Sequence, residues 1–163
     1  MQTLLIFAHT FWEDSKVNKA LLESAKSLNN LTIHNLSTTY KDYKIDVESE
    51  IALLQKADRI IFQFPLFWFS TPSLLKEWED RVLSAIFHSD NPKLLEGKTF
   101  SIITTALGEE SSYDGSDGYG INALLSPINN AFFYLGAKVE EAFCIFSANV
   151  DNLPLQKYLA KLR

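Results

Sequence analysis

Short runs of hydrophobic residues alternate along the chain with segments in which hydrophobic residues recur every three or four positions. The short runs, rich in Ile, Leu, Phe and Val, are typical of buried parallel strands, and the periodic segments are typical of amphipathic helices. This alternation predicts an α/β fold in which helices cover both faces of a parallel sheet. The five expected strands are residues 3–8, 31–36, 59–64, 99–105 and 139–146.

The periodic segments predict five helices, and turn-forming residues indicate where some of them begin. Ser15 is the expected N-cap of the first helix, and Thr71 followed by Pro72 is the expected start of the third. Pro127 must lie in the first turn of the fourth helix or kink it, and the last helix is expected over about residues 154–162. The hydrophobic stripes are Val17, Leu21, Leu22, Ala25 and Leu28; Val47, Ile51, Leu54 and Ala57; Leu75, Trp78, Val82 and Ile86; and Leu124, Leu125, Ile128, Phe132 and Leu135.

Composition favours one globular domain over residues 1–163, because 47% of the residues are hydrophobic and 21% are charged. The formal net charge of −5 argues against a nucleic-acid-binding protein, which needs clustered Lys and Arg. We find neither a signal peptide nor an apolar run long enough to span a bilayer, and therefore expect a cytoplasmic protein.

Candidate metal ligands are sparse in the sequence. His34 and His88 have no partner at metal-ligand spacing, so we interpret both as surface or interface residues and expect no metal site. The acidic run over residues 46–50 is interpreted as the solvated face and first turn of a helix.

Ligands of open parallel sheets bind beyond the carboxyl ends of the strands. That rule selects the loops 9–15, 65–70 and 104–119. The first loop leads into a helix N-terminus that favours a phosphate group, with Ser15 and Asn18 as further donors, although Ser15 could equally serve only as a cap. Since neither GxGxxG nor GxxxxGK[ST] is present, an NAD-binding Rossmann domain and a nucleotide hydrolase are disfavoured.

Consecutive aromatic residues distinguish the second loop. Phe67, Trp68 and Phe69 cannot all point into one core from an extended segment, so some of them must face a ligand or a partner. A flat aromatic cofactor would suit such a wall, and a dimer interface or a misjudged strand end is the alternative.

The third loop is rich in glycine and contains two tyrosines, Tyr113 and Tyr119. Long loops in compact domains are usually functional or disordered, and the tyrosines favour function.

The aromatic loop lies within a longer motif made of Phe64, Pro65, Leu66, Phe67, Trp68, Phe69, Ser70, Thr71 and Pro72, followed by Leu75, Lys76, Glu77, Trp78, Asp80 and Arg81. This motif closely resembles the signature of the NAD(P)H quinone reductase family, and within it the short bacterial members, including the quinone reductases that accompany glutathione-regulated potassium-efflux systems. His9, Ser15 and Asn18 resemble the phosphate loop of that family, and Thr104 with Thr105 resembles the start of its Thr-Thr-Gly-Gly loop.

The resemblance implies a flavodoxin-like fold with strand order 2-1-3-4-5 and a flavin that carries a hydride from NAD(P)H to a quinone. It implies that Tyr113 lies beside the reacting flavin edge and that Tyr119 stands where the animal enzymes have a histidine, which makes both catalytic candidates. The implied cofactor-binding residues are His9, Ser15, Val17 and Asn18 for the phosphate and ribityl chain; Pro65, Leu66, Phe67, Trp68 and Phe69 for the isoalloxazine; and Thr104, Thr105 and Gly108 at its far edge.

Two departures from the family pattern concern the cofactor. Ala106 and Leu107 replace the two glycines of the family loop, which removes conformational freedom beside the flavin. The chain also ends before the extension that completes the adenosine side of the larger FAD-binding members, so we expect FMN rather than FAD.

The resemblance also implies partners. Family members are usually homodimers, which would bury Phe87, Phe132, Phe133 and Tyr134. The related ancillary subunits indicate a membrane potassium-efflux protein as a further partner, bound at the inner membrane face. Two alternatives stay open from the sequence: a regulatory flavoprotein subunit of such a system, and a flavodoxin-like carrier of single electrons without a nicotinamide site.

Overall fold

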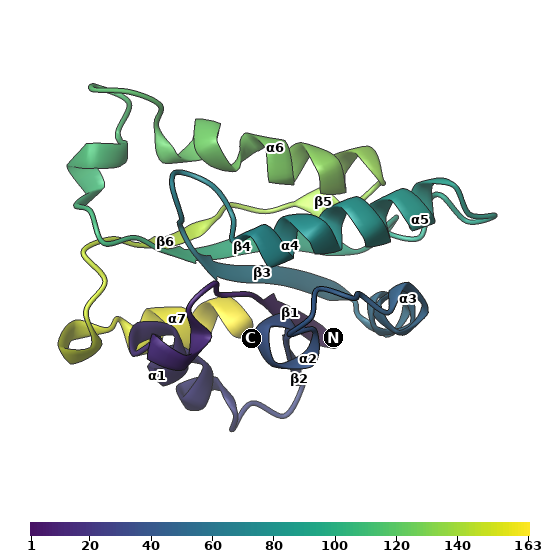
Figure 1. Cartoon of the computed structure of the whole chain (residues 1–163), viewed down its shortest axis with the longest axis horizontal. Coiled ribbons are helices and arrows are strands. Elements are labelled where there is room, and N and C mark those ends of the chain that lie inside the picture. The colour runs from purple at the N-terminus through teal and green to yellow at the C-terminus, as the bar shows by residue number, and fades with distance from the viewer.

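A computed structural model describes residues 1–163 and contains a parallel sheet with helices on both faces (Figure 1). The strand order is β2-β1-β3-β4-β5, and β6 pairs with β4 beyond the end of β5. This confirms the predicted fold and strand order. The strands are β1 (Thr3–Phe7), β2 (Leu31–Asn35), β3 (Arg59–Pro65), β4 (Thr99–Thr105), β5 (Lys138–Val139) and β6 (Phe143–Ile145).

The helices follow the strands in the order that a doubly wound sheet requires. Figure 1 shows α4 and α5 as one continuous rod, because a π-helical segment, η2 (Glu79–Leu83), joins them. None of the helices is both long and apolar enough to cross a membrane. The α-helices are α1 (Val17–Ala25), α2 (Leu36–Thr39), α3 (Val47–Lys56), α4 (Ser73–Trp78), α5 (Ser84–Phe87), α6 (Ile121–Tyr134) and α7 (Leu155–Leu162).

The alternation of side chains along the strands divides the core into two clusters, one on each face of the sheet. In β1, Leu4 and Ile6 belong to a large cluster that α3, α4 and α6 cover. Leu5 and Phe7 point to the opposite face, where α1 and α7 lie side by side and cover a smaller cluster (Figure 1).

Several expected element boundaries and positions differ from the structure, most by one residue. The fifth strand is interrupted over residues 140–142, so it appears as β5 and β6. Helix α4 begins at Ser73 with Pro72 as its N-cap, one residue later than expected, because Pro72 has an extended backbone. Pro127 lies inside α6, in its second turn.

The predicted N-cap role of Ser15 is wrong. Its backbone N–H closes the preceding 3₁₀ turn by bonding to the carbonyl of Trp12 at 3.1 Å, and Lys16 is the N-cap residue of α1. The Ser15 hydroxyl is therefore not used to cap the helix.

The interpretation of the acidic run as solvated surface is wrong for Glu50, which lies beside the partly buried His34. Glu50 is fully buried, and its carboxylate accepts hydrogen bonds from His34 Nε2 at 2.7 Å, from Trp78 Nε1 at 2.7 Å and from the Tyr40 hydroxyl. Burial opposes ionisation of Glu50, but these three donors outweigh it and hold the pKa of the carboxyl below its ordinary value.

One of the four aromatic residues assigned to a dimer interface belongs to the core. The Phe132 ring is fully buried and stacks on Phe100 with centroids 3.6 Å apart. Its neighbours Phe133 and Tyr134 point outward and are exposed, as is much of Phe87.

Candidate functional site

A cavity of about 380 Å³ opens at the carboxyl ends of β1, β3 and β4, where the sheet order reverses. This volume lies within the range of small-molecule sites. The cavity therefore occupies the place that the sequence predicts for a ligand. Its lining residues are His9, Phe11, Asp14, Ser15, Lys16, Val17, Asn18, Pro65, Leu66, Phe67, Thr105, Ala106, Leu107 and Ala148.

One end of the cavity is formed by the start of α1, where polar hydrogens lack acceptors. The backbone N–H groups of Val17, Asn18 and Lys19 bond to no acceptor in the chain, as expected for a first helical turn without a side-chain cap. The Ser15 side chain is buried beside them, and its hydroxyl makes no hydrogen bond within the protein. Together these donors and the helix dipole favour an anionic group.

His9 occupies the end of β1 as a neutral imidazole. Burial, reinforced by the positive charge of Lys19, lowers the pKa of His9 below its ordinary value. Its Nδ1 accepts a hydrogen bond from the Phe11 N–H at 2.9 Å, so the neutral ring carries its proton on Nε2. His9 thus contributes a hydrogen-bond donor to the cavity.

The aromatic loop forms a tight turn rather than an extended segment. Phe67 and Ser70 exchange two backbone hydrogen bonds of 2.9 Å, and the two residues between them have positive φ, 46° at Trp68 and 64° at Phe69. Such angles match a type I′ turn, in which Asn and Gly are the usual residues and bulky side chains are strained. The turn holds the Trp68 ring 92% exposed at the molecular surface.

The rings of this turn contact both neighbouring loops. Phe67 packs edge-on against His9 at 5.5 Å and Phe11 at 5.9 Å, measured between ring centroids. On the other side, Phe69 lies 6.3 Å from the Tyr113 ring. The turn therefore links the loop after β1 to the loop after β4.

The two threonines at the end of β4 have different environments. The Thr104 hydroxyl is buried and donates to the Phe64 carbonyl at 2.8 Å, so it holds β4 to β3. Thr105 lines the cavity, and its hydroxyl oxygen accepts from Asn18 Nδ2 at 3.1 Å. Asn18 in turn accepts from Gln63 Nε2 at 3.2 Å.

The tyrosines of the third loop also have different environments. Tyr113 stacks on Phe146 at 5.5 Å and lies against Gly108, where an added Cβ would come within 3.0 Å of its ring. Gly108 is thus required for the close approach of Tyr113. Tyr119 is exposed on the outer part of the loop.

Eight of the cofactor-binding residues that the resemblance implies line this one cavity, and four do not: Trp68, Phe69, Thr104 and Gly108. Neither Tyr113 nor Tyr119 lines it. Sequence reasoning missed Ala148, which follows β6; applying the carboxyl-end rule to the fifth strand would have found it. The other lining residues not predicted are Phe11, Asp14, Lys16, Ala106 and Leu107.

Comparison with known proteins gives the family. The sequence model of a family described by its flavodoxin-like fold matches residues 1–163. This chain belongs to that family. The chain is 43% identical over 129 residues to the glutathione-regulated potassium-efflux system ancillary protein KefG of Cronobacter sakazakii, covering 77% of this chain and 70% of the relative.

Two solved structures are similar over nearly the whole chain. General stress protein 14 of Treponema denticola, solved in complex with FMN, has a TM-score of 0.89 and 29% identity, covering 99% of this chain and 98% of that one. An NADPH-quinone reductase from P. pentosaceus has a TM-score of 0.86 and 27% identity, covering 99% and 95%. These findings confirm the resemblance that the sequence indicates.

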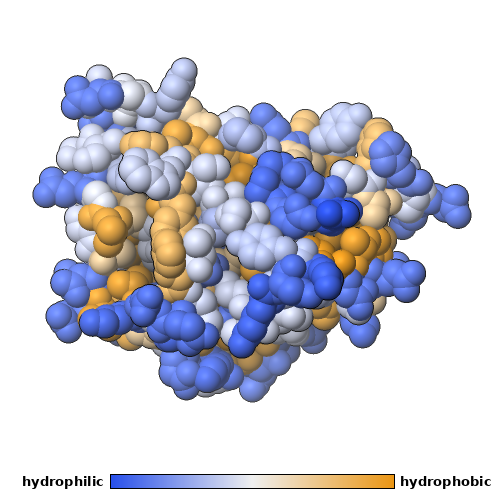
Figure 2. Space-filling view, in the orientation of Figure 1, coloured by the Kyte–Doolittle hydropathy of each residue, from blue (hydrophilic) through white to orange (hydrophobic).

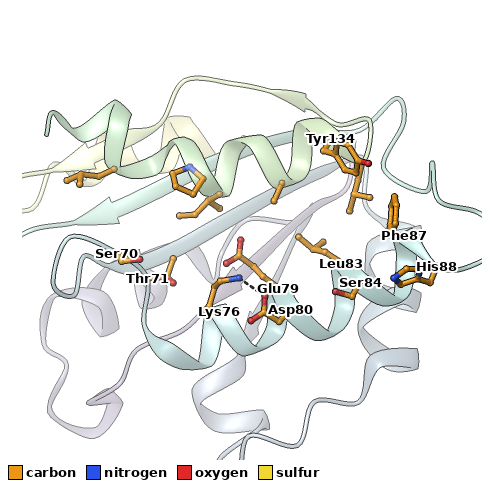
Figure 3. A pocket seen from close by; sticks show the side chains of 15 residues that line it. Ser70, Thr71, Lys76, Glu79, Asp80, Leu83, Ser84, Phe87, His88 and Tyr134 are labelled. Atoms are coloured by element: carbon orange, nitrogen blue, oxygen red, sulfur yellow. Dashed lines mark hydrogen bonds and ion pairs between the residues drawn. The ribbon is translucent and has the colours of Figure 1, made fainter.

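A second cavity, of about 340 Å³, lies between the α4–α5 rod and α6 and is called here the helix groove (Figure 3). Glu79 points into it, is only 6% exposed, and makes no hydrogen bond or ion pair, whereas the neighbouring Lys76 pairs with Asp80. Burial raises the pKa of Glu79 to about 7. Phe87 and Tyr134 flank the groove, with ring centroids 5.8 Å apart.

No group of three or more His, Cys, Asp or Glu side chains is placed to hold a metal ion. His88, the third histidine of the chain, lines the helix groove and packs edge-on against Phe87 at 5.0 Å.

Proposed function

We propose that this chain is an FMN-dependent oxidoreductase that transfers a hydride from NAD(P)H to quinone-like acceptors. The observation that carries the proposal is the cavity at the carboxyl ends of the strands, which combines unpaired donors at the start of α1 with the aromatic turn at the other side. An anionic, flat aromatic cofactor matches both ends.

The residues present fit FMN. The N–H groups of Val17 and Asn18 and the unbonded hydroxyl of Ser15 would hold the phosphate. Pro65, Leu66 and Phe67 would line the isoalloxazine ring with apolar and aromatic surface. The FMN-bound relative of nearly the same length supports FMN over FAD.

Bound FMN would supply the two-electron chemistry, and the chain would supply position and electrostatics. The neutral His9, whose Nδ1 accepts from Phe11, would offer its Nε2–H to the bound cofactor. Tyr113 is the first candidate for a hydrogen bond that steadies developing negative charge, because Phe69, Phe146 and Gly108 hold its ring at the edge of the aromatic turn. Tyr119 is the weaker candidate, since it is exposed.

The first test is flavin binding. Purified protein titrated with FMN should quench flavin fluorescence at a stoichiometry of one, and FAD should bind more weakly. Ser15→Ala should weaken FMN binding about fivefold to tenfold through the loss of one charge-assisted hydrogen bond. Ser24→Ala is the matched control, because the Ser24 hydroxyl bonds only to the Leu21 carbonyl of its own helix. A protein that binds neither flavin contradicts the proposal.

The second test is steady-state turnover. The FMN-loaded protein should oxidise NADPH or NADH continuously when menadione is present. Flavin binding without nicotinamide oxidation would instead support the single-electron carrier.

A second function has its own support. The 43% identity to a potassium-efflux ancillary protein favours a role at the cytosolic face of a related efflux protein. Co-purification with such a protein, and slower efflux after deletion of the gene, are expected. Unchanged efflux in the deletion strain contradicts this role.

We further propose that a second copy of this chain covers the helix groove. Exposed Phe87 and Tyr134 line it, and Figure 2 shows apolar surface reaching the outside near α5 among hydrophilic residues. A partner would bring polar groups to the unbonded Glu79. Sedimentation should give a dimer that Tyr134→Glu dissociates. A monomeric wild-type protein contradicts this assembly.

A further inference from the structure

A chain of buried hydrogen bonds connects the C-terminal helix to the candidate cofactor cavity. The Tyr158 hydroxyl in α7 donates to Gln63 Oε1 at 2.8 Å, Gln63 Nε2 donates to Asn18 Oδ1 at 3.2 Å, and Asn18 Nδ2 donates to Thr105 Oγ1 at 3.1 Å. None of the four residues is more than 4% exposed. Asn18 and Thr105 line the cavity, whereas Tyr158 and Gln63 do not reach it.

These polar side chains lie in an otherwise apolar part of the core. Gln63 is opposite Phe7 and Ile103 in the neighbouring strands, and the Tyr158 ring belongs to the cluster under α1 and α7. A leucine at position 63 would pack there without needing any hydrogen-bond partner. A fully connected hydrogen-bond network in an apolar core fixes the orientation of the side chains that form it.

The direction of these three hydrogen bonds depends on which hydroxyl hydrogen, that of Tyr158 or that of Thr105, is left without an acceptor. In the observed direction the phenolic hydrogen of Tyr158 is used by Gln63, and the hydroxyl hydrogen of Thr105 is left free at the cavity. The second N–H of each amide bonds to no acceptor in either direction, so it does not distinguish the two. Reversing every bond would leave the phenolic hydrogen of Tyr158 unpaired in the dry core. Burial also raises the pKa of Tyr158, so the phenol keeps its proton.

We infer that Tyr158 is a positioning residue for the cofactor site: its hydroxyl fixes the orientation of the Gln63 and Asn18 amides, so that Thr105 donates its hydrogen to an acceptor atom of the bound ligand. The inference rests on the proposed function in taking that ligand to be FMN. It predicts that the FMN atom in contact with Thr105 is a hydrogen-bond acceptor, such as a carbonyl oxygen or a ring nitrogen. Without the Tyr158 hydroxyl, both amides can turn and Thr105 can donate to Asn18 instead.

A double-mutant cycle tests this action through Thr105. Tyr158→Phe should weaken FMN binding about tenfold when Thr105 is present, since the ligand loses an oriented donor. In the Thr105→Val background the same change should cost less than about twofold, because no hydroxyl is left to orient. Thr105→Ser, which keeps the hydroxyl, should bind FMN within about threefold of wild type. An equal loss in both backgrounds overturns the inference, because Tyr158 would then act only through stability.

Tyr40→Phe is the matched control for a lost buried tyrosine hydroxyl. Tyr40 donates to Glu50 and has no bond to the chain from Tyr158 to Thr105. It should leave FMN binding unchanged within about twofold, although it removes a buried tyrosine hydrogen bond to a charged acceptor, which is stronger than the bond of Tyr158 to a neutral amide. A loss as large as that of Tyr158→Phe overturns the inference.

The bond direction is testable without flavin and without any substitution. In ¹⁵N-labelled wild-type protein, nuclear Overhauser effects should connect the Asn18 side-chain amide protons to Thr105 and the Gln63 amide protons to Asn18. Effects between the Gln63 amide protons and the Tyr158 ring, with none to Asn18, reverse the chain and overturn the inference. A protein with the predicted contacts that does not bind FMN keeps the network and rejects the proposed function.

Discussion

Two carboxyl groups are buried on the same side of the sheet, and they have opposite surroundings. Glu50 of α3 accepts hydrogen bonds from three side chains, whereas Glu79 of the helix groove accepts none. The hydrogen bonds lower the pKa of Glu50 in spite of burial, whereas burial, as the largest influence, raises the pKa of Glu79 to about 7.

This difference in hydrogen bonding indicates that Glu50 is a structural group, whereas Glu79 is available for binding. The donors to Glu50 come from β2, α4 and the residue after α2, so the carboxylate connects three elements of the fold. The groove around Glu79 contains the paired Lys76 and Asp80 together with other polar side chains, but none of them bonds to the Glu79 carboxyl group. A buried polar group without partners is unfavourable unless something else satisfies it, which is why we assign the groove to a second copy.

The largest expected change in the free energy of unfolding comes from removing the charge of Glu50, which accepts hydrogen bonds from three donors. Glu50→Gln should destabilise the protein by about 2–4 kcal/mol in urea unfolding at pH 7, because the new amide group faces donors rather than acceptors. Glu48→Gln, at an exposed position of the same helix, should change stability by less than about 0.5 kcal/mol.

The stability difference between wild type and Glu50→Gln should depend on pH, and the pKa of Glu50 determines the sign of that dependence. Because the folded-state pKa of Glu50 is lowered, its contribution is present above the ordinary value of 4.5 and is lost as the pH falls through the lowered value. The two unfolding curves should therefore approach each other in acid. A constant difference down to pH 3 contradicts the assignment.

Glu79 should show the opposite pH dependence. Its folded-state pKa of about 7 lies above the ordinary 4.5, so the stability contributed by its proton is present below pH 4.5 and is lost as the pH rises through 7. Glu79→Gln cannot lose a proton, and at pH 9 it should be on the order of 2 kcal/mol more stable than wild type. At pH 5 the two should be nearly equal.

Glu77→Gln provides the control for this change, since Glu77 is on the same helix and pairs with Arg81 near the surface. Its stability should follow the wild-type curve across the whole pH range. If Glu79→Gln also ran parallel to wild type, Glu79 would be ionised in the folded protein and the contrast with Glu50 would disappear.

The smallest effect concerns the strained turn, where the cost is in the backbone. Trp68→Gly should stabilise the ligand-free protein by about 1 kcal/mol, because glycine accepts positive φ and the exposed ring makes few contacts. Trp68→Ala removes the same ring but keeps the Cβ, so it should show no such gain. If both variants were equally stable, the turn would not be strained, and its positive φ would carry no implication for function.

The sequence predicts the candidate site better than it predicts the buried polar groups of the core. The family-like motif placed Ser15, Val17, Asn18 and Phe67 at one cavity because loops at the carboxyl ends of adjacent parallel strands must meet. The same reasoning interpreted Glu50 as solvated, because its position in a charged run does not indicate that hydrogen-bond donors from other elements surround its carboxylate. It assigned Phe132 both to the hydrophobic stripe of α6 and to a dimer interface, and the structure supports only the stripe, because the Phe132 ring points into the core whereas that of Phe133 points outward.

The sequence by itself therefore determined the α/β class, the strand order through family resemblance, and the loops that form the cavity. Hydrophobic periodicity and turn chemistry act over a few residues, and such local signals can be read along the chain. The tertiary structure alone decided which polar groups satisfy one another: Glu50 meets Trp78 across 28 positions, and Gln63 meets Tyr158 across 95. It also left Glu79 without a partner, because hydrogen bonding in the core depends on side chains that only the packed fold brings within reach.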